Sequence, residues 1–188
     1  ELKAVSEGYF VNRHDVMYND FVIIGPADDH AKIKDIKSAN DAFKRIAEKG
    51  STFISRGDKS GTHTKELSIW KKTGIEPKGQ KWYLEVGQGM EKTQRIANEK
   101  RGYTLTDRGT WLATKDKDKL DMIIVLEGDP VLFNQYGVMA VNPEKHKHTK
   151  YKEAMEFVNW IISSEGQKAI ADFKDKNNNQ LFYPNAKK

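Results

Sequence analysis

The chain has 188 residues, of which 37% are hydrophobic and 10% aromatic, and 32 Lys and Arg stand against 27 Asp and Glu for a net charge of +5. This composition can build a buried core and suits one larger domain or two small lobes. The absence of Cys excludes disulfides, thiolate metal sites and cysteine nucleophiles. Because the positive charge is dispersed and not gathered in one patch, we expect no nucleic-acid partner.

Targeting and membrane signals are also missing from this sequence. No window approaches 18 uninterrupted apolar residues, so we expect no membrane-spanning helix. The opening residues ELKAVSEGYF match neither a secretory signal nor a transit sequence. The chain lacks an initiator Met and starts with a helical pattern, so we expect its natural start to lie further upstream.

Strand-length apolar runs alternate with helical periodicity along the chain, which is typical of an α/β fold. Helical spacing from Ile33 to Ala47 predicts a helix that ends before Gly50, and Ser164 to Gln167 have the form of a capping box that starts the last helix. Other helices are predicted over residues 62–73, 90–100 and 151–162, and strands over residues 21–24, 52–55, 82–86, 103–106, 122–126 and 136–141.

Such regular alternation predicts parallel strand pairing, in which ligands bind at the carboxyl ends of the strands. The segment SRGDKSGTH, from Ser55 to His63, lies at such an end. It joins a predicted strand to a predicted helix, so its side chains are expected at the mouth of a ligand site.

The chemistry of this segment suits an anion. Ser60 fits an N-cap, and Gly61 lets the backbone approach a ligand. His63 stands where a capping box needs Glu or Gln, so several N–H groups of the helix start remain free to bind an anion. The guanidinium of Arg56 adds a fork of donors, and the hydroxyls of Ser60 and Thr62 add two more. We therefore predict an oxyanion site formed by Arg56, Ser60, Gly61 and Thr62.

Three neighbours are further candidates for this site. Asp58 could hold the guanidinium of Arg56 in place, or it could be a simple turn residue. Ser55 adds a hydroxyl, and His63 is either a contact or, as is common for a lone histidine in a first helical turn, a packing residue. For the whole segment, the alternative is a capped helix after a polar loop.

No catalytic residue is predicted. The spacing of Gly57, Ser60 and Gly61 differs from the G-x-S-x-G elbow of serine hydrolases, and a G-x-x-x-x-G-K-[ST] phosphate loop is absent. His146 and His148 are an isolated pair without a third ligand nearby, so neither a metal site nor a cofactor is expected.

The longer motifs resemble a known family. These are SRGDKSGTHTKELSIWKKTG, VGQGM, TLTDRGTWLA, VLFNQYGVMAVNPEKH, SSEGQKAIADF, LFYPNAKK and, near the start, VNRHDVMYNDFVIIGP. They cover nearly the whole chain and resemble the periplasmic tungstate-binding proteins of ABC importers. The pattern R-x-D-x-S-G-T is also similar to that of periplasmic phosphate-binding proteins. The resemblance implies an α/β fold of the type II periplasmic-binding-protein kind, with two lobes joined by a two-strand hinge.

By this resemblance, residues 1–26 are the end of lobe one and the first hinge crossing, residues 27–126 are lobe two, and residues 127–188 are the return crossing and the C-terminal part of lobe one. The family normally opens with a strand and a helix that carry a Thr-Thr-Thr-Ser motif. No such motif precedes Glu1 here, so the first lobe is expected to be incomplete in this chain.

The resemblance also implies roles for residues and partners. Arg56, Ser60 and Thr62, with N–H groups around Gly61, would contact the anion. Arg108 in TLTDRGT matches the family as well, either as a contact or as a partner of Asp107 or of a strand end. We expect a periplasmic or otherwise extracytoplasmic monomer that delivers its ligand to an ABC permease and touches the membrane only through that protein.

The predicted function is therefore transport of tungstate, with molybdate as a second ligand, because these dianions carry no proton near neutral pH and suit a site made of donors. Phosphate or another oxyanion is the alternative within the same class. An effector-sensing domain of a transcriptional regulator is an alternative of a different class, since regulators use the same two-lobed architecture. An enzyme with Ser60 as nucleophile is the least favoured.

Overall fold

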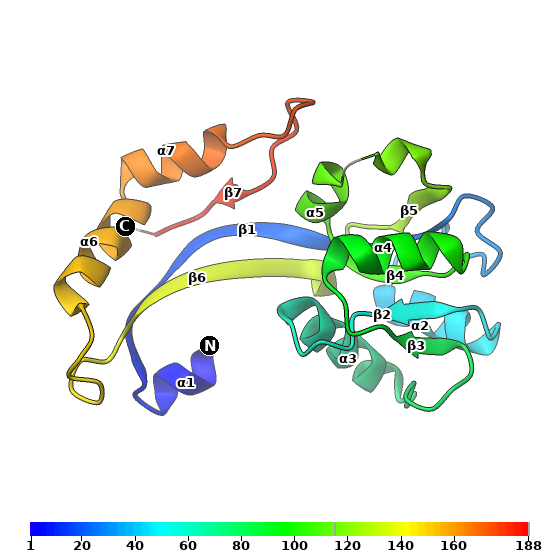
Figure 1. Ribbon diagram of the computed structural model, residues 1–188, viewed down its shortest axis with the longest axis horizontal. Helices are drawn as coiled ribbons and strands as arrows, with labels where there is room; N and C mark the ends of the chain where they lie inside the picture. Colours follow the sequence, from blue (N-terminus) through cyan, green and yellow to red (C-terminus); the bar gives the residue numbers. More distant parts are fainter. Residues whose placement is uncertain (115, 188) are drawn as a thin grey trace. The chain divides into compact units, whose positions relative to one another are not determined.

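The computed structural model describes residues 1–114 and 116–187 and divides the chain into two compact units. Unit 1 comprises Glu1–Asn19 and the segment from Asn134 onward, and unit 2 comprises Asp20–Phe133. The chain passes between them within strand β1 (Phe10–Pro26) and again at the start of strand β6 (Phe133–Val141), and these two strands pair with one another (Figure 1). The sequence pattern predicts only the last part of β1, because its first half alternates irregularly between polar and apolar residues.

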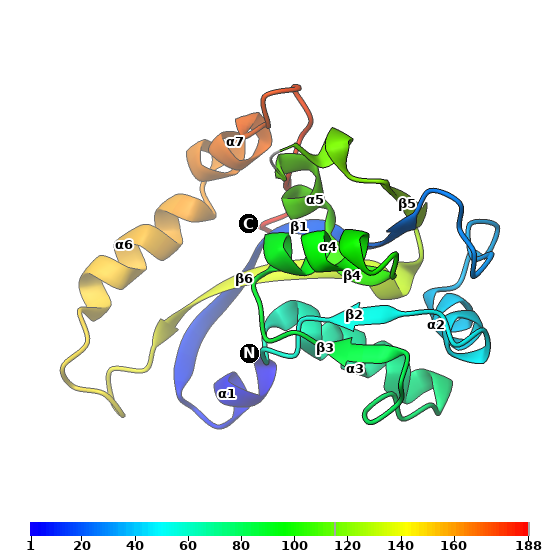
Figure 2. The ribbon, with the colours of Figure 1, turned by 45° about the vertical axis from the view of Figure 1, so that its right-hand side comes forward.

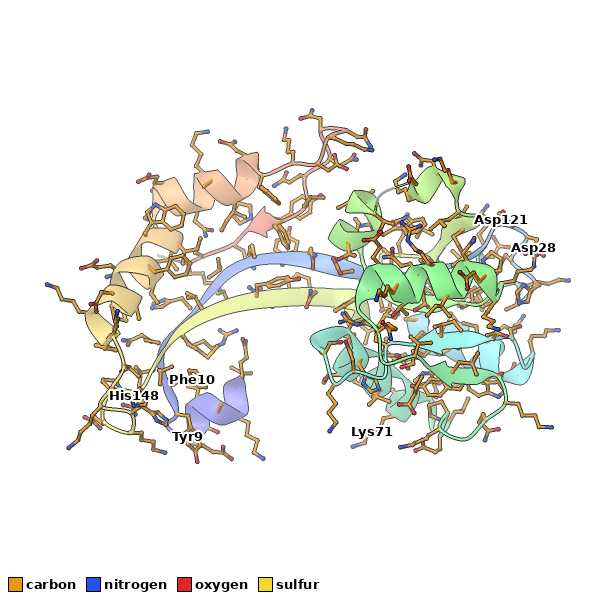
Figure 3. The ribbon with its side chains drawn as sticks, in the orientation of Figure 1. Tyr9, Phe10, Asp28, Lys71, Asp121 and His148 are labelled. Carbon is orange, nitrogen blue, oxygen red and sulfur yellow. The ribbon has the colours of Figure 1, made fainter. Side chains whose placement is uncertain are left out.

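In unit 1, strand pairing and contacts between aromatic rings connect segments that are distant in sequence. The two-residue strand β7 (Tyr183–Pro184) pairs antiparallel with β1, and the ring of Tyr183 stacks on that of Tyr18 at 5.3 Å. The ring of Tyr9 lies 6.3 Å from that of His146, which is itself 6.1 Å from that of His148. Tyr9 and His148 are labelled in Figure 3. The helices of unit 1 are α1 (Leu2–Ser6), α6 (Tyr151–Ile161) and α7 (Ser164–Asp172).

The start of α7 differs from the predicted capping box. The N-cap is Ser163, one residue earlier, and its side chain accepts from the backbone N–H of Gly166. Gln167, predicted to close the box, donates instead to the carbonyls of Val16 and Ile161, both at 3.0 Å. The prediction was wrong because a preceding serine could cap the helix and left Gln167 free for contacts that are distant in sequence.

Unit 2 is built on β1, which carries β4 (Thr104–Asp107) on one side and β5 (Met122–Leu126) on the other, both antiparallel. Strand β2 (Phe53–Ser55) pairs in parallel with β3 (Tyr83–Glu85), and a parallel bridge from Phe53 to Tyr103 links this pair to the start of β4. Parallel pairing is thus confirmed for β2 and β3 and wrong for β1. The alternation of strands and helices along the sequence does not determine whether β1 runs parallel or antiparallel to its neighbours.

Helices cover both faces of the strands in unit 2 (Figures 1 and 2). Phe21 and Ile23 of β1 pack in one core with α2 and α3, whereas Val22 and Ile24 pack in a second core with α4 and α5. Successive side chains of a strand point to opposite faces, so one continuous apolar run supplies both cores. The helices are α2 (Ala39–Glu48), α3 (Gly61–Thr73), α4 (Met90–Glu99) and α5 (Arg108–Ala113), with short 3₁₀ turns η1 (Lys117–Lys119) and η2 (Pro130–Leu132).

Helix α2 is shorter than the helical spacing predicts. It begins after Ser38, whose side chain accepts from the N–H of Asp41, while the N–H of Ala39 donates to the carboxylate of Asp129 at 2.7 Å. Ile33 is fully buried without being helical. The predicted first turns of this helix were wrong. Apolar residues at helical spacing indicate burial, and side chains in a loop can be buried as well.

A close contact at Gly25 fixes the end of β1. A Cβ atom at this position would lie 2.4 Å from Cδ1 of Tyr103. The ring of Tyr103 is fully buried, and its hydroxyl donates to Asp29 and accepts from the N–H of Ala31. The ring therefore has no room to move, and only glycine fits beside it.

We predict that Gly25→Ala lowers the free energy of unfolding by about 2 to 3 kcal/mol, because the added methyl overpacks a buried ring held at its hydroxyl. Urea denaturation measures this effect. Gly61→Ala is the matched control for stability, because Gly61 is the first helical residue of α3 and a Cβ there meets nothing within 4 Å. Equal stabilities of the two variants would contradict the packing argument.

No helix in the described part of the chain combines the length and apolar character that crossing a membrane requires.

Candidate functional site

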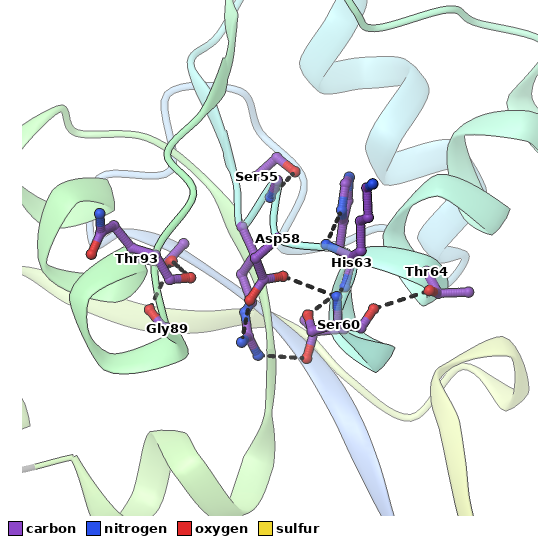
Figure 4. Close-up of polar contacts among 12 residues, drawn as sticks. Ser55, Asp58, Ser60, His63, Thr64, Gly89 and Thr93 are labelled. Atoms are coloured by element: carbon purple, nitrogen blue, oxygen red, sulfur yellow. Dashed lines mark hydrogen bonds and ion pairs between the residues drawn. The ribbon is translucent and has the colours of Figure 1, made fainter.

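The predicted anion segment lies at the carboxyl edge of the parallel pair β2 and β3. Residues 56–60 lead from the end of β2 into α3, and residues 86–89 lead from the end of β3 into α4. Two helix starts therefore follow two adjacent parallel strands, which places them at one edge of the sheet. Figure 4 shows Gly89 and Thr93 of the second helix start in the same close-up as Asp58 and Ser60.

Both helix starts keep free donors. The side chain of Ser60 accepts from the N–H of His63 at 3.3 Å, as predicted for an N-cap. Among the described residues, the N–H groups of Gly61 and Thr62 have no hydrogen-bond partner. Gly89, the N-cap of α4, makes no side-chain cap bond. Uncapped N–H groups carry the positive end of each helix dipole, so this edge of the sheet favours negative charge.

Asp58 holds the guanidinium of Arg56. One carboxylate oxygen pairs with Nη2 of Arg56 at 2.5 Å, and the other accepts from the N–H of Ser60 at 3.1 Å (Figure 4). Burial raises the pKa of Asp58, but hydrogen bonds from Ser60 and Arg56 outweigh it, so the pKa lies below its ordinary value. Asp58 is therefore a charged partner that fixes the arginine, and not only a turn residue.

The remaining donors of Arg56 are only partly used. Its Nη1 lies 3.4 Å from the hydroxyl oxygen of Thr62, and its Nε is buried without a hydrogen-bond partner in the described residues. A buried N–H without a partner is costly. Arg56 and Thr62 are thus within reach of one another, and their binding of an anion, together with Ser60, stays a prediction.

The two glycines of the segment serve different needs. Gly57 has φ of +60°, and a Cβ there would lie 2.8 Å from Cβ of Glu85, so the fold itself requires glycine. Gly61 is exposed, and a Cβ there would meet nothing within 4 Å. Nothing within the described chain demands glycine at position 61, and the open space beside it is where a ligand can approach the helix start.

Ser55 and His63 hold the segment from inside. Ser55 is fully buried, donates its hydroxyl to Glu66 at 2.7 Å and accepts from the N–H of Gly57 at 3.2 Å. Nδ1 of His63 accepts from the N–H of Lys59 at 3.0 Å, so the proton of the neutral ring lies on Nε2, which is 3.9 Å from Glu85. Both side chains thus bind other parts of the protein. A contact of either one with the ligand stays a prediction.

Glu66 is a member of this site that the sequence analysis missed. It is 2% exposed and accepts from Ser55, from the hydroxyl of Tyr83 at 2.7 Å and from Nε1 of Trp70 at 3.1 Å. Burial raises the pKa of Glu66 to about 7 despite these hydrogen bonds. Its position between the buried residues Thr62 and Trp70 on one face of α3 was the available signal, because a carboxylate in an apolar stripe needs a reason.

Arg108 is engaged elsewhere in unit 2. Its guanidinium binds both oxygens of Asp20 at 2.7 and 2.6 Å and Glu127 at 2.6 Å. The hydrogen bonds that Arg108 donates to Asp20 raise its pKa against the effect of burial, and its pair with Glu127 adds to this. The predicted alternative of a pair with Asp107 was wrong, because the Asp107 side chain caps α5 by accepting from Thr110. A ligand role for Arg108 stays a prediction.

Clusters of three or more His, Asp or Glu side chains that could hold a metal ion are absent from the described residues.

We predict that stability and pH are linked through Glu66. Its pKa is about 7 when folded and near 4.5 when exposed, so its contribution to stability is full below pH 4.5 and is lost as pH rises through 7. Relative to Glu66→Gln, the wild-type protein should lose about 2 to 3 kcal/mol of unfolding free energy between pH 5 and pH 8. Urea denaturation of both proteins across this range measures the difference, and a constant difference would refute the assignment.

Comparison with known proteins adds relatives to this geometry. Residues 1–165 match the family model described as PBP superfamily domain. The tungstate-binding protein TupA of Peptoclostridium acidaminophilum is 45% identical over 100% of this chain and 66% of its own length, and TupA of Campylobacter jejuni is 44% identical over 100% of this chain and 70% of its own.

A solved structure has a similar fold. The tungstate-binding protein TupA from Desulfovibrio alaskensis superposes with a TM-score of 0.84 at 43% identity, covering 99% of this chain and 75% of that one. The chain spans 55% to 70% of the length of the curated relatives that it matches.

Proposed function

Since the chain belongs to the PBP superfamily and, within it, to the family of tungstate-binding proteins, we propose that it supplies one side of the oxyanion site in the solute-binding component of an ABC importer. The predicted α/β fold of the periplasmic-binding kind is confirmed by the family match and by the structural likeness. The ligand is tungstate, with molybdate as a second anion of the same shape and charge.

The observation that carries the proposal is the balance of donors and acceptors at the helix starts. Arg56, Ser60, Thr62 and the N–H groups of Gly61 and Thr62 can all donate. The carboxylate within the loop itself, that of Asp58, is already occupied by Arg56 and by the N–H of Ser60. Such a site suits a dianion without protons, whereas hydrogen phosphate brings a proton that needs a free acceptor.

The same geometry favours binding over catalysis. The imidazole of His63 accepts from the N–H of Lys59, so it is not the base of Ser60, whose oxygen accepts from the backbone of His63. We therefore assign Ser60 as a ligand donor. The partner is the permease of the importer, and the place of action is the extracytoplasmic side of the membrane.

Titration calorimetry of the full protein with tungstate, molybdate, sulfate and phosphate tests the proposal. Tungstate and molybdate should bind more tightly than phosphate by at least about 2 kcal/mol, the cost of a buried polar group, here the phosphate proton, without a partner. Sulfate, a dianion without a proton, serves as the comparison that lacks this mismatch. Tightest binding of phosphate would overturn the choice of ligand. Absence of binding by all four anions would overturn the function.

We predict that Arg56→Ala weakens tungstate binding by at least about 2 kcal/mol, or roughly 30-fold, because it removes a charged donor held in place by Asp58. Calorimetry of the full protein measures the loss. Arg45→Ala is the control, because Arg45 is a half-exposed residue of α2 that pairs with Glu48. Unchanged affinity in Arg56→Ala would mean that the anion binds elsewhere.

We also predict that Gly61→Ala leaves stability within about 0.5 kcal/mol, because the fold offers room for a methyl. The same methyl would enter the space that the oxyanion occupies, so tungstate affinity should fall at least about tenfold, or 1.4 kcal/mol. Calorimetry and urea denaturation of the same sample separate the two effects. Wild-type affinity in a stable variant would contradict a ligand over the start of α3.

A further inference from the structure

A buried carboxylate lies one helical turn behind the candidate oxyanion site. Glu66 is four residues after Thr62, on the same face of α3 and about 6 Å further along the helix axis. Its carboxylate contacts Ser55 of β2, Tyr83 of β3 and Trp70 of α3 itself. All three contacts come from neutral donors, and none of the described residues forms an ion pair with Glu66.

The surroundings offer little to balance a negative charge at Glu66. On β3, Glu85 adds a second carboxylate, and Tyr83 is a neutral phenol. On α3, His63 lies with Nε2 3.9 Å from Glu85, and the buried residues of α2 are apolar. In the loop, the guanidinium of Arg56 pairs with the carboxylate of Asp58 and not with Glu66. A dianion at the start of α3 would thus add a third negative group next to two carboxylates.

A chain of two hydrogen bonds connects Glu66 to the loop that carries Arg56. The hydroxyl of Ser55 donates to Oε2 of Glu66, and its oxygen accepts from the N–H of Gly57. Gly57 holds the left-handed conformation on which the path of the loop depends. The state of Glu66 therefore reaches the anion loop through Ser55, a residue that has no room to turn away because it is fully buried.

We propose that Glu66 is a positioning residue that couples oxyanion binding to the uptake of one proton from solvent, an inference that rests on the proposed function. When the carboxylate is ionised, the hydroxyl of Ser55 donates a hydrogen bond to Glu66. When Oε2 takes up a proton from solvent, it donates that proton to the oxygen of Ser55. The hydroxyl of Ser55 keeps its own proton, which rotates away from Glu66. The bond from Gly57 to Ser55 is kept in both states, and one negative charge behind the anion is removed.

The proton balance gives the direction of the effect. Burial already raises the pKa of Glu66 to about 7, so a fraction of the protein is protonated near neutral pH. A bound dianion raises this pKa further, because it disfavours the nearby carboxylate. Binding then takes up protons, and affinity rises as pH falls through the range around 7.

Calorimetry of the full protein with tungstate, in two buffers of different ionisation enthalpy at pH 7, counts the protons directly. We expect uptake of about half a proton per anion. From pH 6 to pH 8.5 the affinity should fall about fivefold or more. Proton uptake of zero in the wild-type protein would overturn the proposal without any variant, and failure to bind tungstate at every pH would instead overturn the proposed function.

Variants identify the group that takes up the proton. Glu66→Gln should bind tungstate with no proton uptake and with an affinity that is flat over the same range. Glu99→Gln, an exposed glutamate of α4, is the matched control and should keep the wild-type profile. A profile in Glu66→Gln that is as steep as that of the wild type would overturn the proposal.

A second variant tests the same carboxylate if Glu66→Gln folds poorly. Tyr83→Phe removes one of the three donors that favour ionised Glu66, so it should raise the midpoint of the affinity profile to higher pH. A purely structural role of this contact would lower affinity at every pH by the same factor. An unshifted midpoint in stable Tyr83→Phe would overturn the proposal.

Discussion

The carboxylate of Glu66 ties together the three elements on which the candidate site is built. It accepts from Ser55 at the end of β2, from Tyr83 on β3 and from Trp70 within α3. The loop that carries Arg56 leaves β2 at Ser55 and enters α3 at Ser60, so Glu66, itself a residue of α3, holds the β2 end of this loop through Ser55. Burying a carboxylate is costly, and three good hydrogen bonds offset only part of that cost. Burial therefore raises the pKa of Glu66 to about 7, and ionisable groups with strongly shifted pKa values are often functional.

Two arginines of unit 2 show how partners decide what a charge can do. Arg108 is bound by both oxygens of Asp20 and by Glu127, so its charge is spent on holding segments of unit 2 together. Among the described residues, Arg56 has one carboxylate partner, Asp58, which fixes its position and leaves its buried Nε without a hydrogen-bond partner. A guanidinium that is fixed but not saturated is suited to a further anion. The sequence contains both arginines in similar polar contexts, and only their partners separate them.

Parallel pairing of β2 with β3 brings two helix starts, those of α3 and α4, to the same edge of the sheet. Each of these strands turns into a helix at the same edge, and neither α3 nor α4 has its first N–H groups fully capped. The positive ends of two helix dipoles and the donors of Arg56, Ser60 and Thr62 are therefore available at one edge of the sheet. Glycine at position 61 keeps this edge open, since the fold does not need glycine there.

Local chemistry in the sequence was sufficient to predict the α/β class, the cap at Ser60 and the helix from about Thr62 to Thr73, because caps and breakers act over a few residues. The tertiary structure alone decided the antiparallel pairing of β1, the partners of Arg108 and the burial of Glu66 among Ser55, Tyr83 and Trp70. These features join residues that are distant in sequence. No local pattern records which of many polar side chains will meet once the chain has folded.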